Sequence, residues 1–198
     1  MTSRSDTGVW LTPSDGRRWR FYPGALSLAF GCTGDFGYNV DAWETLRKPT
    51  DLNLWLSERF GPVLHPSDDA DFGGAKQLRA AITSTARRAA SGQILDPADI
   101  DTINLWASRP SVPQYLPGGT HGPVPPTPSQ MLATIAHDAI QAFATTAGMV
   151  RECAAEDCHL IFLDTSRPQS RRWCSMSRCG GRAKARAHYA RHLTGERS

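Results

Sequence analysis

The pattern of apolar and polar residues predicts a mostly helical body. Apolar residues recur at i, i+3 and i+4 in four stretches of the chain, which is the spacing of one buried face of an α-helix. Capping residues, glycine or proline bound these stretches, as they usually bound helices. The predicted helices cover residues 50–60, 68–91, 97–107 and 128–146.

Alternating and proline-rich patterns predict the strands. Leu26, Leu28 and Phe30 alternate with smaller residues, which predicts a strand with one buried face. Residues 112–124 contain prolines around a Gly-rich turn, so we expect an edge hairpin there. The apolar run 160–163 predicts a short strand that packs against the body.

The first twenty residues are polar and include Arg17, Arg18 and Arg20. We expect a disordered arm over residues 1–20, as is common at chain termini. These arginines could touch phosphates, but a solvated tail is the simpler interpretation.

Four of the five cysteines lie close together near the C-terminus. They form two pairs, Cys153-x4-Cys158 and Cys174-x4-Cys179, with fifteen residues between the pairs. Two short pairs joined by a longer loop can bring four thiolates around one ion, so the spacing predicts a tetrahedral four-cysteine site with one Zn²⁺ per chain. Two disulfides are the alternative, which is disfavoured because nothing at the N-terminus resembles a secretory signal.

The remaining cysteine and three histidines are the other candidate ligands. Cys32 lies far from the cluster in sequence and is expected to be a buried core thiol. His159, His188 and His192 are not expected to bind zinc, because four cysteines already fill a tetrahedral site. A zinc site with four cysteine ligands is coordinatively closed and leaves no position for water, so we expect no enzymatic activity.

Positive charge is concentrated in the same region. Residues 1–150 have 12 Lys and Arg against 14 Asp and Glu, whereas residues 151–198 have 10 against 5. Between residues 165 and 195 there are eight cations and no carboxylate. A small metal-binding unit whose charged side chains are all positive over this stretch is typical of proteins that bind a polyanion. The candidate DNA-contacting residues are Arg167, Arg171, Arg172, Arg178, Arg182, Lys184, Arg186 and Arg191.

A basic helix is expected from Ser175 onward. Along it Arg178, Arg182 and Arg186 recur every four residues, which predicts that they share one face. We expect Arg182 and Arg186 to reach base edges, while Arg171 and the other cations hold phosphates.

Four motifs in this region resemble the CGNR zinc-finger family. They are Cys153-Ala-Ala-Glu-Asp-Cys158, Phe162-Leu-Asp-Thr-Ser-Arg167, Arg171-Arg-Trp-Cys-Ser-Met176 and Cys179-Gly-Gly-Arg182-Ala-Lys184. Gly181 stands where that family usually has Asn. Upstream, residues 26–33 and 49–56 resemble the ABATE domain, although Ala29 and Cys32 replace its usual Asp and Asn.

The resemblance implies a transcription regulator with an ABATE-like helical body before the finger. We expect the fold class to be mainly α with a few short strands: a helical N-terminal body plus a small C-terminal zinc knuckle with four cysteine ligands and a basic helix. The body would span residues 21–148, fold without the finger, and sense a ligand or mediate dimerisation. The CGNR-type finger would span residues 149–198.

The expected function is zinc-dependent DNA binding, with DNA as the partner. The alternative is a zinc-knuckle module that binds RNA or an acidic protein partner of the transcription machinery. A small-molecule effector and a homodimer are left open. No run of eighteen apolar residues occurs, so we expect no membrane partner and a cytoplasmic, nucleoid-associated protein.

Overall fold

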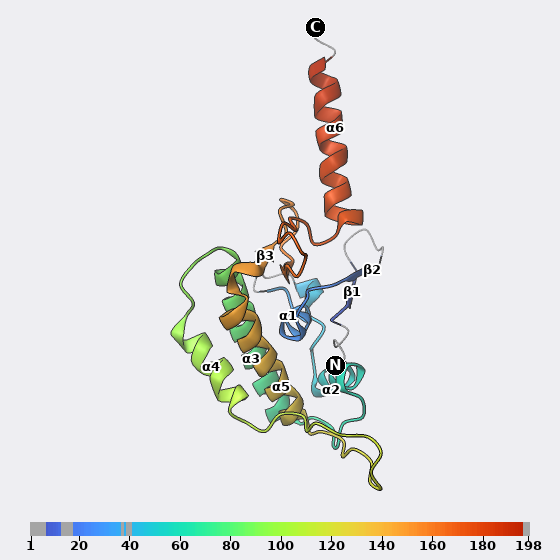
Figure 1. Cartoon of the computed structure of the whole chain (residues 1–198), viewed down its shortest axis with the longest axis vertical. Coiled ribbons are helices and arrows are strands. Elements are labelled where there is room, and N and C mark those ends of the chain that lie inside the picture. The colour runs from blue at the N-terminus through green and yellow to red at the C-terminus, as the bar shows by residue number, and fades with distance from the viewer. Residues whose placement is uncertain (1–6, 13–17, 37, 39–40, 196–198) are drawn as a thin grey trace.

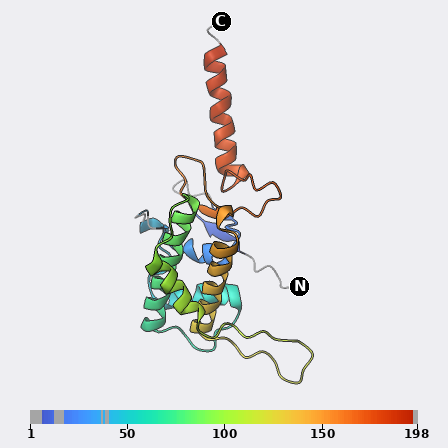
Figure 2. The same ribbon diagram turned by 60° about the vertical axis from the view of Figure 1, so that its left-hand side comes forward.

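Two long helices, α3 and α5, lie side by side at the centre of the body (Figures 1 and 2). α4 packs against both of them, and α1 contacts both from the other side. The body helices are α1 (Leu26–Gly31), α2 (Pro49–Phe60), α3 (Asp69–Ala90), α4 (Pro97–Ala107) and α5 (Pro128–Ile140). Short 3-10 turns occur at Asp41–Trp43 and Ala147–Met149. This computed structural model describes residues 7–12, 18–36, 38 and 41–195.

Side-chain caps explain where the predicted helices begin. The backbone N–H of Asp71 donates to the Asp68 carboxylate at 2.8 Å, which caps α3. The N–H of Gln130 donates to the Thr127 hydroxyl at 3.2 Å, and the reciprocal bond completes the capping box of α5. The helix predicted over residues 128–146 is confirmed, although its last part, Gln141–Thr145, is a π-helical turn.

The segment expected to be a strand at residues 26–30 is helix α1, so that prediction is wrong. Every residue of α1 is buried. The alternation of larger and smaller residues in this segment therefore does not separate a buried face from an exposed one. Its N-cap residue, Ala25, has no side chain that can cap the helix. Instead, Asp138 on α5 accepts a 2.6 Å hydrogen bond from the backbone N–H of Ser27. A residue from a distant part of the chain thus accepts a hydrogen bond from one of the backbone N–H groups that have no partner within the first turn of the helix.

The N-terminal residues form a two-stranded antiparallel sheet of β1 (Val9–Leu11) and β2 (Trp19–Phe21). Val9 pairs with Phe21, and both side chains are buried. The expectation of a disordered arm is therefore wrong for the strand residues, whose apolar side chains anchor them to the core. Arg17 lies outside the described residues.

The proline-rich stretch at residues 112–124 is an extended loop and not the expected edge hairpin. It leaves the body at the end opposite α6 (Figure 1). Its prolines have no N–H to donate to a strand ladder. The Tyr115 hydroxyl donates to the His121 carbonyl at 2.9 Å and holds the two arms of the loop together.

A second antiparallel pair, β3 (Val150–Glu152) and β4 (Ile161–Leu163), joins the finger to the body. All of β4 is buried, as predicted for this apolar run, and it packs against α1 and α3. The N–H of Leu163 donates to the Pro23 carbonyl at 2.7 Å. Phe162 is fully buried in the same cluster as the core residues of α1, α3 and α5. The body and the finger therefore share one core.

The basic helix predicted from Ser175 is present. It begins with a π-helical turn, Met176–Gly180, and continues as α6 (Gly181–Gly195). α6 projects away from the rest of the molecule (Figures 1 and 2), and its side chains up to residue 192 are exposed except for the partly covered Ala183. Within the described part of the chain, no helix has both the length and the apolar character needed to cross a bilayer.

Candidate metal centre

Short turns on both sides of β4 bring the paired cysteines together. Cys153 directly follows β3, and its N–H donates to the Leu160 carbonyl at 3.0 Å. Cys158 closes a tight turn by donating its N–H to the Ala155 carbonyl at 3.0 Å. Cys174 lies in the loop before the π-helical turn, and Cys179 lies within that turn.

The four cysteine sulfurs are arranged as a single metal site. All four residues are buried, and their sulfur atoms lie within 4.8 Å of one another. Cys158 Sγ is 3.7 Å from Cys174 Sγ, and Cys174 Sγ is 3.4 Å from Cys179 Sγ. Sulfurs bound tetrahedrally to zinc at about 2.3 Å would be about 3.8 Å apart. The predicted cluster is thus confirmed, and it fits one Zn²⁺.

The crowding of the thiols shows why this site favours a cation. Hydrogen bonds from the thiols of Cys158 and Cys174 lower the pKa of Cys153 to about 2. The hydrogen bond with Cys153 in turn raises the pKa of Cys158 to about 12, and the pKa of Cys174 is also raised. The sulfurs therefore compete for one negative charge. A divalent ion removes that competition, because zinc binds all its cysteine ligands as thiolates.

Arg182 supports the ligand sulfurs from outside. Its guanidinium donates to Cys179 Sγ at 3.2 Å and to the Asp157 carboxylate at 2.7 Å. The hydrogen bond to Cys179 is the main reason why the pKa of Arg182 is raised. The backbone N–H of Cys174 donates to Cys153 Sγ at 3.3 Å. Such outer contacts orient metal ligands and balance their charge.

Arg171 holds the long loop of the finger in place. Its guanidinium donates to the carbonyls of Trp173 and Cys174, and at 3.3 Å to that of Tyr22 in the body. It also lies over the ring of Phe162, with Cζ 4.0 Å from the ring centroid. These internal partners use several of its donors, and the expected phosphate-holding role of Arg171 stays a prediction.

Asp164 fixes the other end of the same loop. Its buried carboxylate accepts hydrogen bonds from the N–H and hydroxyl of Ser166 at 3.0 and 2.6 Å, and from the N–H of Arg171 at 2.8 Å. Burial alone would raise the pKa of Asp164, but these hydrogen bonds lower it below its usual value. The sequence motif includes Asp164, but nothing in the sequence alone indicates this anchoring role.

The two glycines where the π-helical turn meets α6, Gly180 and Gly181, differ in whether a side chain fits. A Cβ on Gly180 would lie 2.8 Å from Met176 Sδ and 3.1 Å from Trp173 Cδ1, which is too close. A Cβ on Gly181 would meet only the Met176 carbonyl oxygen at 3.4 Å, and Gly181 has helical φ and ψ angles. A side chain at position 180 would therefore require Met176 and Trp173 to shift, whereas the local structure accepts without such shifts the Asn that the CGNR family usually has at position 181.

Comparison with known families gives two matches that together cover most of the chain. Residues 149–192 match the CGNR zinc finger. Residues 24–146 match ABATE, whose description is "putative stress-induced transcription regulator". The chain belongs to the ABATE family. The two matches confirm the resemblance seen in the sequence. No curated protein matches it.

The three helix arginines that were expected to share one face have different partners in this ABATE protein. Arg178 lies in the π-helical turn, with its guanidinium 5.4 Å from the ring centroid of Trp19. Arg182 and Arg186 turn instead towards Asp157, at 2.7 and 3.9 Å.

The other candidate DNA-contacting residues are distributed over the loop and α6. Lys184 and Arg191 lie on the side of α6 opposite Arg182 and Arg186, because each residue advances the helix by about 100°. Arg172 is exposed beside Trp173, with its Cζ 5.3 Å from a ring centroid, and Arg167 is exposed on the long loop.

The remaining candidate ligands lie away from the metal centre. Cys32 is buried in the body core, and burial raises the pKa of its thiol. His159 Nδ1 is 3.0 Å from the Glu152 carboxylate. His188 and His192 face each other on α6, with their Nε2 atoms 3.1 Å apart. Among the described residues, the metal-binding group consists of the four cysteines alone.

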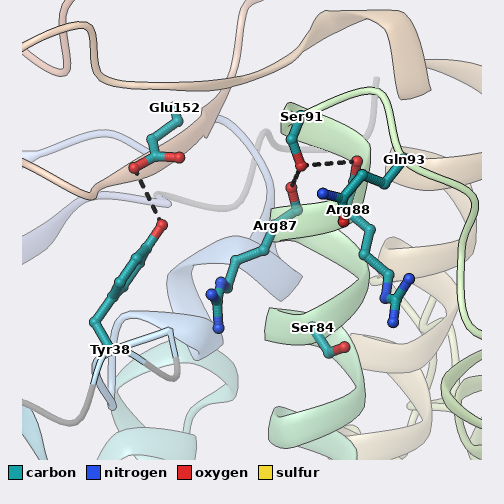
Figure 3. A pocket seen from close by; sticks show the side chains of 7 residues that line it. All are labelled: Tyr38, Ser84, Arg87, Arg88, Ser91, Gln93 and Glu152. Carbon is teal, nitrogen blue, oxygen red and sulfur yellow. Dashed lines mark hydrogen bonds between the residues drawn. The ribbon is translucent and has the colours of Figure 1, made fainter.

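A half-open polar cleft of about 310 Å³ lies where the end of α3 meets β3 (Figure 3). The Tyr38 hydroxyl donates to the Glu152 carboxylate at 3.1 Å, and the Arg87 guanidinium lies over the Tyr38 ring at 4.6 Å. Glu152 immediately precedes the zinc ligand Cys153 in the chain, so the cleft connects the body to the finger. It is lined by Tyr38, Ser84, Arg87, Arg88, Ser91, Gln93 and Glu152.

Proposed function

We propose that this ABATE protein is a zinc-dependent DNA-binding transcription regulator. The observation that supports this most strongly is α6, an exposed helix with several cations and no carboxylate that projects from the body (Figure 1). A helix with side chains is about 10–12 Å wide and fits the major groove of B-DNA, which is about 12 Å wide. The shape and charge of α6 therefore suit duplex DNA.

In this proposal the metal centre sets the direction of α6. Cys179 lies in the turn that begins the helix, and Arg182 in the first turn of α6 donates to the Cys179 sulfur. Because Arg182 and Arg186 face Asp157, the opposite side of the helix is better placed to enter the groove. We therefore assign base contacts to Lys184 and its side of α6, and phosphate contacts to the exposed loop arginines such as Arg172.

The polar cleft supports ligand sensing by the body. A small polar ligand there would contact Arg87 on α3 and Glu152 on β3, which leads directly into the zinc site. The hydroxyl, amide, guanidinium and carboxylate groups that line the cleft suit a ligand with both hydrogen-bond donors and acceptors. Binding would couple to the finger by moving β3 relative to α3. A nucleoid location would follow from the DNA-binding function.

Fluorescence anisotropy with a duplex from the protein's own promoter region tests the proposal. If about five cations pair with phosphates, log K should fall against log salt with a slope of about −4.5. Binding should then weaken roughly 500-fold between about 50 and 200 mM salt. Lys184→Ala should relax sequence preference, and Arg172→Ala should reduce the slope by about 0.9 on every sequence, while the body control Lys76→Ala should bind normally.

Competition distinguishes the alternative partner classes. Unlabelled promoter duplex should displace the probe better than a nonspecific duplex or an RNA of equal length. If the zinc-loaded protein shows no salt-dependent affinity for DNA, or if RNA competes better than any duplex, the basic helix serves another partner and the proposal fails.

A further inference from the structure

Two histidines lie one turn apart on the projecting helix α6 (Figure 1). His188 and His192 are four positions apart, which places their side chains next to each other on a helix. Their Nε2 atoms are 3.1 Å apart, and their ring centroids are 4.3 Å apart. Both residues are exposed. Two imidazoles at this spacing on a helix can bind one metal ion together.

The distance between the two nitrogens fits a shared ion. An imidazole nitrogen lies about 2.0–2.1 Å from a bound zinc ion, so two such nitrogens are about 2.9 Å apart at a right angle and about 3.3 Å apart at the tetrahedral angle. The observed separation of 3.1 Å lies between these values. Each Nε2 becomes a ligand when the ring proton is on Nδ1. A bound ion would then replace the hydrogen bond that joins the two rings.

The charge around the histidine pair decides which kind of cation fits. Lys184 is one turn before the pair, Arg191 lies between its two members in the chain, and α6 contains no carboxylate. Glu156 and Asp157 approach α6 near its start, where their carboxylates are each 3.9 Å from Arg186. The positive charges disfavour any cation at the pair, so an ion must be held by its bonds to nitrogen.

Binding through nitrogen selects divalent transition metals. Imidazole is a good ligand for Zn²⁺, Ni²⁺ and Cu²⁺, whereas Mg²⁺ and Ca²⁺ prefer oxygen ligands. Among the described residues, the group with three or more possible ligands is the cysteine cluster. The histidine pair has only two protein ligands and leaves positions for water, in contrast to the closed cysteine site. It is therefore a weaker site, which fills after the cysteine cluster.

From these observations we propose that His188 and His192 form a second metal site, which binds one divalent transition-metal ion through both Nε2 atoms. The ion joins two successive turns of α6 beyond the cysteine cluster. Opening these turns separates the two ligands, so the bound ion holds the outer part of the helix in its helical form. Because the site fills only when free metal is abundant, the order of α6 responds to the metal supply. This inference does not depend on DNA binding.

Isothermal titration calorimetry with NiCl₂ tests the site in the full-length, zinc-loaded protein. His188→Gln should weaken Ni²⁺ binding roughly 100-fold, because the second imidazole no longer acts at a high effective concentration. The matched control Ala187→His/His188→Ala keeps the composition but places the two histidines five positions apart, about 140° around the helix. It should bind as weakly as His188→Gln. His65→Gln/His121→Gln removes two exposed histidines from the body and should bind normally.

Two further measurements test the chemistry of the site and its effect on the helix. MgCl₂ should show no binding that depends on His188. With Ni²⁺ at about 100 times its Kd, the amides of the outer turns of α6 should exchange hydrogen roughly 100-fold more slowly in the wild type. Their exchange should not change in Ala187→His/His188→Ala. Elemental analysis shows whether each sample keeps its zinc.

Several results would overturn the proposal. If Ala187→His/His188→Ala binds Ni²⁺ as tightly as the wild type, the ligands lie elsewhere. If Mg²⁺ binds as well as Ni²⁺, nitrogen ligands do not hold the ion. If Ni²⁺ uptake is matched by loss of zinc, the ion has entered the cysteine cluster. If the amides of α6 exchange equally with and without Ni²⁺, the ion does not order the helix. No DNA is present in these measurements, so their failure leaves the proposed function intact.

Discussion

Replacing Phe162 by Ala should destabilise the whole molecule and not only the zinc finger. Phe162 belongs to β4 in the finger, yet it is fully buried in the cluster that also contains the core of α1, α3 and α5. Truncating a buried Phe removes its transfer free energy and leaves a cavity, which together amount to about 3–5 kcal/mol. Proteins of this kind unfold with about 5–15 kcal/mol in total. The loss should therefore be a large share of the free energy of unfolding.

Urea denaturation with two probes tests this shared core. Far-UV circular dichroism follows the body helices, and a chromogenic chelator follows zinc release. In Phe162→Ala both transitions should move to lower urea together. The control Leu116→Ala, at a position that is 87% exposed, should leave both unchanged. If zinc release shifts while the helical transition stays in place, the finger is an independent unit and the reasoning from the shared core is refuted.

Three further predictions concern the finger itself. Cys174→Ser should lose the zinc and unfold the residues around it, since structural zinc supplies about 10–16 kcal/mol in small modules; a variant that retains full zinc by elemental analysis would refute the ligand assignment. Gly181→Ala should raise the free energy of unfolding by about 0.5–1 kcal/mol and so raise the thermal midpoint, whereas Gly180→Ala should gain less because its Cβ requires Met176 and Trp173 to shift; a larger gain for Gly180→Ala would contradict this. The lowered pKa of Asp164 means that its carboxylate stabilises the fold above its unfolded pKa of about 3.9, and that this contribution is lost as pH falls through the folded value. Asp164→Asn should therefore be less stable at neutral pH and show a flatter loss below about pH 4; equal pH profiles in denaturant titrations would contradict this.

The metal centre could be predicted from the sequence because its signal is local. The spacing of Cys153, Cys158, Cys174 and Cys179 is typical of two ligand pairs around one metal ion, and this pattern can be recognised without knowing how the rest of the chain folds. The long helices were similarly evident, since caps such as Asp68 and their apolar periodicity lie within the helices themselves.

The features that the sequence did not reveal depend on contacts between distant residues. α1 is completed by Asp138, more than a hundred positions away in the chain. The hairpin strands are only three residues long and are held by burial of Val9 and Phe21, so their local signal is weak. Arg171 looked like a free cation because only the folded loop places carbonyl groups around its guanidinium.

The isolation of α6 has a consequence for how recognition occurs. A helix of 15 residues with no packed face is marginal in water, because forming its first turn is unfavourable by a factor of about 10⁻³. The metal fixes that first turn through Cys179, so zinc acts as a permanent nucleus from which the helix grows. Helical order is then expected to decrease with distance from the ion. If α6 binds DNA as proposed, a partly frayed outer end would become fully ordered only on a matching site, and selectivity would arise from completing the helix as well as from individual contacts.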